Sequence, residues 1–156
     1  MKMEKLRGDN HLYRKNNNTM NKKLTLIAAV LFTATFAFAQ NTLEVTVKNI
    51  KNKTGSIRVA LFDSEDHFLK TALKGEVVKI TGETVTVVFK DLPAGTYAAS
   101  AVHDENENGK LDRGDMGIPV EKYGFSRNAA STFGPPQFSD ASFAVPDTKS
   151  ISITVQ

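Results

Sequence analysis

Apolar and polar residues alternate along most of the chain after residue 40, which is the pattern of half-buried β-strands. In the segment LEVTVKNI, for example, Leu43, Val45 and Val47 alternate with polar neighbours, so one face should meet a core. Turn signals rich in Gly, Pro, Asn and Asp separate such segments. The predicted strands are residues 43–50, 56–63, 76–80, 83–89, the second part of 91–103, 141–145 and 149–156.

Short strands in this number predict an all-β fold, a two-sheet antiparallel sandwich of about seven strands without a second domain. One connection of almost forty residues, between His103 and Ala141, interrupts the series, and loops of that length usually carry function. Residues 64–75 are the one helical candidate, with the alternative of a loop that tucks Phe68 and Leu73 under the sandwich. The expected core residues are Val45, Val47, Ile57, Val59, Leu61, Val85, Val87, Phe89, Tyr97, Phe143, Ile151 and Ile153.

Residues 1–39 follow a different pattern. From Met20 the chain has two lysines, an apolar run over residues 24–36 and the small-x-small sequence Ala37-Phe38-Ala39, the layout of a secretory signal peptide. We therefore expect residues 20–39 to be removed before Gln40, and residues 40–156 to be exported to the periplasm or secreted. A membrane anchor is the alternative, but the run falls short of the roughly 20 residues that a spanning helix needs. Residues 1–19 are polar and Asn-rich, so they are either an untranslated upstream extension or a disordered leader.

Removal of this segment reverses the charge of the protein. The whole chain has a formal net charge of +3, but residues 1–39 hold seven Lys/Arg and two Asp/Glu, which leaves 13 basic and 15 acidic groups, a net of −2. The remaining domain has no basic stripe with interleaved aromatic residues, so a nucleic-acid partner is not expected. The chain has no cysteine, which excludes disulfides, thiol nucleophiles and lipid attachment at a cysteine.

The long connection opens with HDENENGKLDRGD, which matches a calcium-binding loop at all but its last position. Oxygen-bearing side chains recur at positions one, three, five, nine and twelve, and a glycine at position six permits the sharp turn. Calcium prefers six to eight oxygen ligands. The predicted calcium ligands are the side chains of Asp104, Asn106, Asn108, Asp112 and Asp115 and the backbone carbonyl of Lys110.

Two features weaken this match and leave an alternative open. Position twelve is Asp115 rather than the usual Glu, whose longer side chain binds with both oxygens, and the flanks are a strand and a coil instead of two helices. The predicted site is therefore weak, with a dissociation constant of about 10⁻⁴–10⁻³ M. The alternative is an ion-free loop in which Asp, Asn and Gly build successive Asx-turns.

The motifs of this region resemble a known family. The sequences LPAGTYAASAVHDENENGKLDRGD, GIPVEKYGFS and GPPQFSDASFAV are similar to the bacterial family catalogued as domain of unknown function 2141. In that family an LP-x-G-x-YA turn precedes an HD-x-N-x-NGKLD loop, which GIP-x-E-x-YGFS and PP-x-F-x-DA-x-F follow. The resemblance covers essentially all of the chain after residue 40. It implies an exported β-sandwich of the Ig-like, transthyretin-like or carboxypeptidase-regulatory-like kind, and it implies no function.

Catalytic patterns are sparse, so we do not expect an enzyme. No serine lies in a G-x-S-x-G elbow, and one histidine near the loop, His103, is too few for a zinc site. His103 is expected to be a structural hydrogen-bond donor. The preferred function is an exported non-catalytic module, without a transmembrane segment after signal removal, that binds a protein or glycan of the envelope or the extracellular space. The alternative is a small hydrolase that uses the carboxylates of Asp104, Asp112, Asp115 and Glu121.

Four aromatic residues of the long connection have two interpretations. They either line a groove or pack the loop down on the sheet, as compact loops of this length do. These residues are Tyr123, Phe125, Phe133 and Phe138.

Overall fold

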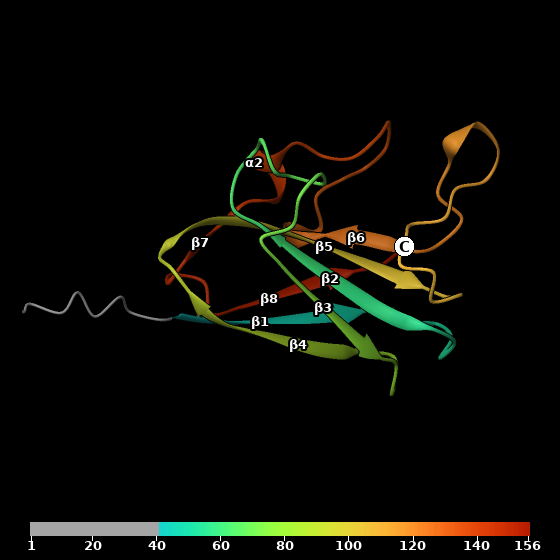
Figure 1. Ribbon diagram of the computed structural model, residues 1–156, viewed down its shortest axis with the longest axis horizontal. Coiled ribbons are helices and arrows are strands. Elements are labelled where there is room, and N and C mark those ends of the chain that lie inside the picture. The colour runs from blue at the N-terminus through green and yellow to red at the C-terminus, as the bar shows by residue number, and fades with distance from the viewer. Residues whose placement is uncertain (1–40) are drawn as a thin grey trace, which may run out of the picture. The chain divides into compact units, whose positions relative to one another are not determined.

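A computed structural model describes residues 41–156 of the chain (Figure 1). The predicted leader and signal peptide, and the expected cleavage before Gln40, lie outside these residues. Within residues 41–156, none of the helices has the length and apolar character needed to cross a membrane.

Two sheets account for most of the described chain, which confirms the predicted all-β sandwich. The smaller sheet has the order β4-β1-β8 and the larger one β3-β2-β5-β6, with β7 paired to the first part of β5 (Figure 1). The strands are β1 (Asn41–Lys48), β2 (Ser56–Phe62), β3 (Lys74–Lys79), β4 (Val85–Leu92), β5 (Gly95–Asp104), β6 (Tyr123–Phe125), β7 (Phe143–Val145) and β8 (Ser150–Thr154).

The inward faces of both sheets form one hydrophobic core, as the alternation predicted. Ten of the twelve expected residues are buried, and the other two, Phe143 and Ile151, are half-buried and pack against the core. A second cluster covers part of the outer face of the larger sheet. It consists of Phe62, Phe68, Ala98, Phe125 and Ala141. Strand β5 is therefore covered on both faces, which explains its small buried alanines.

Not every strand pair is antiparallel, and the prediction was wrong on this point. Strand β8 runs parallel to β1, with Val45 opposite Ile151. The chain leaves β7 beside the larger sheet and crosses to the smaller sheet through residues 146–149. A hairpin would force the two strands that it joins to be antiparallel. Residues 146–149 instead cross between the sheets, so β8 is free to pair in parallel with β1.

The helical candidate at residues 64–75 does not form a helix. Residues 65–70 are turns, and Leu69 has a φ of 57°, which interrupts a right-handed helix. The loop alternative is correct for Phe68, which is buried edge-on to Phe62, and wrong for Leu73, which is exposed. Helical turns occur instead at η1 (Asp115–Gly117), η2 (Ser126–Asn128) and α2 (Phe138–Ala141).

Strand β6 lies inside the long connection, where no strand was predicted, so residues 41–156 form eight strands. It adds to β5, with Ser100 opposite Phe125, and its backbone also meets the end of the chain through hydrogen bonds between Tyr123 and Gln156. At Gly124 a Cβ atom would lie 2.4 Å from the Thr154 carbonyl oxygen, so a side chain there is excluded. This contact joins the edges of the two sheets.

We predict that Ser126→Ala lowers the free energy of unfolding by about 2–3 kcal/mol, because it leaves buried backbone groups without partners. Ser126 is fully buried; its Oγ accepts the N–H of Ala99 at 2.9 Å and donates to the Ala141 carbonyl. Urea denaturation measures the change. The control Ser150→Ala, at an exposed position of β8, should change stability by less than about 0.5 kcal/mol. Equal effects of the two substitutions would contradict this role of Ser126.

Candidate functional site

Asp104, the last residue of β5, is fully buried and anchors the polar loop, by which we mean residues 104–112. Its Oδ1 accepts the N–H of Asn108 at 3.1 Å and its Oδ2 that of Gly109 at 2.8 Å. The Arg58 Nη1 lies 3.7 Å from Oδ2. Gly109 has a φ of +81°, which a glycine adopts without steric cost. One carboxylate thus closes the turn over residues 104–109.

Asp112 gathers the two asparagine side chains of the loop. The Nδ2 groups of Asn106 and Asn108 donate to its two carboxylate oxygens at 2.6 and 2.9 Å. The Oδ1 atoms of these asparagines accept the N–H groups of Asn108 and Lys110, forming successive Asx-turns. The structure therefore brings together four predicted ligand residues, with Lys110 next to them in the same loop.

Asp115 lies apart from this group. After Asp112 the chain enters a short hairpin, in which the N–H of Val120 donates to the Asp112 carbonyl and Gly114 to Ile118. Asp115 begins η1 at the exposed tip. The calcium-loop template assumes a compact turn up to its twelfth position, and the hairpin instead carries position twelve outward.

Glu121 braces the two ends of the loop, a role that the sequence analysis did not identify. Its carboxylate is buried; Oε1 accepts the N–H of Glu105 at 2.9 Å and Oε2 that of Asp112 at 3.0 Å. In the sequence, the only sign of this role was the presence of a glutamate in the segment GIPVEKYGFS. Because this residue follows the returning strand of the hairpin, only the pairing of that hairpin shows where its side chain lies.

The side-chain oxygens of the loop are suitable ligands for calcium, but the hydrogen bonds described above close the loop without an ion. Carboxylate and amide oxygens are the hard ligands that Ca²⁺ prefers. Within residues 41–156, however, no three His, Asp or Glu side chains lie close enough together to hold a metal ion. An ion would have to replace the N–H bonds that Asn106 and Asn108 make to Asp112.

His103 lies beside this loop and has a structural contact, as expected. It is fully buried, and its Nε2 lies 2.8 Å from the Thr54 carbonyl oxygen. Because a carbonyl only accepts, Nε2 carries the proton and donates. Within the described residues Nδ1 has no hydrogen-bond partner, since Glu105 Oε1 is 3.9 Å away.

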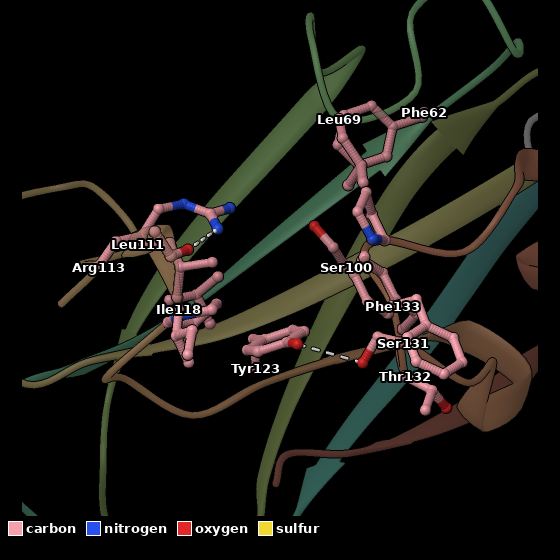
Figure 2. A pocket seen from close by; sticks show the side chains of 16 residues that line it. Phe62, Leu69, Ser100, Leu111, Arg113, Ile118, Tyr123, Ser131, Thr132 and Phe133 are labelled. Carbon is pink, nitrogen blue, oxygen red and sulfur yellow. Dashed lines mark hydrogen bonds between the residues drawn. The ribbon is translucent and has the colours of Figure 1, made fainter. Parts of the chain in front are cut away.

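A cleft of about 740 Å³ lies on the outer face of the larger sheet (Figure 2). Its floor contains Phe62 of β2, Ser100 and Val102 of β5, and Tyr123 and Phe125 of β6. The hairpin forms one wall with Leu111, Arg113 and Ile118, and the loop before α2 forms the other with Ser131, Thr132 and Phe133. Figure 2 shows these two walls on either side of Tyr123.

Both interpretations of the aromatic residues apply. Tyr123, Phe125 and Phe133 line the cleft, and Tyr123 Oη lies 3.2 Å from Ser131 Oγ, which links the floor to one wall. Phe138 packs edge-on against Phe68 and holds the loop on the sheet. Phe133 is fully exposed, so one wall presents an uncovered aromatic ring to the cleft and to solvent.

We predict that Glu121→Gln lowers the free energy of unfolding by about 1–3 kcal/mol, because the amide group has one oxygen and can accept from only one of the two N–H groups. Hydrogen exchange should speed up at the amides of Glu105 and Asp112. Glu107→Gln, an exposed substitution in the same loop, is the matched control and should leave both quantities unchanged. Unaltered exchange in Glu121→Gln would show that the carboxylate does not brace the loop.

Comparison with known proteins gives one match. Neither the curated proteins nor the solved structures contain a match to this chain. The transthyretin-like resemblance therefore stays a prediction. A family model described as an uncharacterised protein conserved in bacteria matches residues 45–154, which is more than half of the chain and includes the loop, the hairpin and both walls of the cleft. The chain belongs to this bacterial family, domain of unknown function 2141.

Proposed function

We propose that the protein is an exported, non-catalytic binding module whose ligand site is the apolar cleft. The observation that carries this proposal is the cleft itself. Its volume of about 740 Å³ falls within the range of roughly 300–1,000 Å³ that is typical of ligand sites, and such sites are mostly apolar with a few polar groups. Export rests on the signal-peptide pattern of residues 20–39 and places the partner in the envelope or outside the cell.

The hydrolase alternative has less support. Glycoside hydrolysis needs two carboxyl groups that face the substrate. None of the 16 residues that line the cleft is Asp, Glu or His. Of the four carboxylates that the hydrolase alternative would use, Asp104 and Glu121 accept backbone N–H groups and Asp112 accepts side-chain amides. Asp115 lies at the hairpin tip.

The residues that line the cleft also bear on the choice between the two expected partners, a protein and a glycan. Sugar hydroxyls are best held by amide and carboxylate groups, and the part of the chain that the structure describes contributes no Asn, Gln, Asp or Glu to the cleft lining. Aromatic and aliphatic side chains predominate, among them Ile118, Tyr123 and Phe133. The cleft therefore supports the apolar part of a partner better than a glycan.

We retain calcium as the ion of the polar loop in this proposal. The ligands would be Asp104, Asn106, Asn108, Asp112 and the Lys110 carbonyl, and Asp115 is expected to contribute least because of its position at the hairpin tip. Bound there, Ca²⁺ would stiffen the loop that leads into one wall of the cleft. Its role would be structural.

Nile red, a neutral apolar dye, tests the cleft. We predict that the protein enhances its fluorescence and that Phe133→Ser reduces this enhancement severalfold, because the exposed ring forms part of one wall. Val88→Ser removes an exposed apolar side chain from β4 of the smaller sheet, outside the cleft, and should have no effect. Equal losses in both variants, or no enhancement by the parent protein, would refute the proposed site.

Calcium should raise the melting temperature. An ion that binds only the folded chain, at a few millimolar and with a dissociation constant near 10⁻⁴ M, stabilises it by about 2 kcal/mol. For a domain of this size the melting temperature should rise by several degrees over that in chelator. Magnesium should do less, because it demands a tighter octahedral shell.

Each variant is compared with itself in calcium and in chelator, since Asp104→Ala also removes structural hydrogen bonds. Asp104→Ala should abolish the calcium-dependent rise. Asp115→Ala should preserve it. If the parent protein melts at the same temperature in calcium and in chelator, the loop binds no ion and is held by its hydrogen bonds alone.

A further inference from the structure

Among residues 41–156, a single charged residue lines the cleft. Among the 16 lining residues that charge is Arg113, on the hairpin wall. Its Nη1 donates to the Gly117 carbonyl at 2.8 Å, which positions the guanidinium. A guanidinium has five N–H donors in a planar fork that matches a carboxylate, so one such bond leaves most of its donors for a ligand.

An apolar surface leads away from this charge. Figure 2 shows Arg113 and Ile118 on one side of Tyr123, and Phe133 on the other. Four lining residues carry hydroxyl groups, and two of these, on Tyr123 and Ser131, bond each other. An occupant therefore meets one cation at one wall and mostly hydrocarbon over the rest of its length.

We infer that the cleft binds a single-chain amphiphile with a terminal carboxylate, a molecule of the fatty-acid class. This inference rests on the proposed binding function and adds the class of ligand. Arg113 holds the carboxylate, and the surface between Ile118 and Phe133 covers the acyl chain. A flat membrane surface fits less well, because it would touch the exposed hairpin tip and Phe133 without reaching the floor residues Ser100 and Val102.

Isothermal titration calorimetry with laurate tests the inference in calcium-free buffer, since calcium precipitates fatty acids. Laurate should bind at least tenfold more tightly than butyrate, which lacks the long chain, and than dodecyltrimethylammonium, which has the opposite charge. Arg113→Gln should weaken laurate binding by about tenfold or more, because charge-assisted bidentate bonds are lost. The loss of laurate binding in this variant should exceed any change in its Nile red binding, because the dye has no charge.

Arg127→Gln is the matched control, because this arginine is exposed, bonds the Ser142 carbonyl and does not line the cleft. It should bind laurate like the parent protein. Equal affinity for laurate and dodecyltrimethylammonium, or an unchanged laurate affinity in Arg113→Gln, would overturn the inference. Co-sedimentation with phosphatidylglycerol vesicles that laurate does not compete away would overturn it as well, in favour of a membrane contact. Nile red binding decides the proposed function separately, since that dye has no charge.

Discussion

The outward-facing residues of β5 fix the floor of the cleft and the start of the polar loop. Alternation along a strand places Ala98, Ser100, Val102 and Asp104 on one face of the larger sheet. Ala98 belongs to the second cluster on the outer face, Ser100 and Val102 form part of the floor of the cleft, and Asp104 anchors the polar loop. Because β5 is central, with β2 on one side and β6 and β7 on the other, this row cannot shift without breaking the sheet. A slip of one residue would turn Asp104 into the core.

Two buried carboxylates, those of Asp104 and Glu121, hold the polar loop in place between β5 and the hairpin wall. A buried carboxylate is costly unless hydrogen bonds compensate for its lost hydration, and Asp104 and Glu121 each accept two backbone N–H groups. Glu121 lies where the hairpin returns to the sheet, and it ties together the start and the end of the loop. Loop residues 106–110 are exposed, so little hydrophobic contact holds them. The conformation of one cleft wall therefore depends on a few directed hydrogen bonds rather than on packing.

The sequence pattern was most informative where structure follows from local periodicity. Alternation identified the core residues of β1, β2 and β4, and the spacing of oxygen-bearing residues identified the group from Asp104 to Asp112. Pairings between distant segments left no comparable signal. Strand β6 is three residues long, too short for a period to appear, and it depends on Gly124 approaching Thr154. The parallel pairing of β8 and the outward position of Asp115 likewise follow from how the chain turns between elements.

The long connection divides into segments with different physical tasks, and this division explains its composition. Its first part is rich in Asp and Asn because a tight loop on the end of a central strand needs side-chain acceptors for its own backbone N–H groups. Its later parts carry Ile118 and Phe133, which are exposed at the cleft. By contrast, Phe125 is buried and Phe138 packs against Phe68. A ring that is exposed to solvent gains little stabilisation from burial. Its placement opposite Arg113, across the floor that β2, β5 and β6 form, suits the apolar ligand that we propose for the cleft.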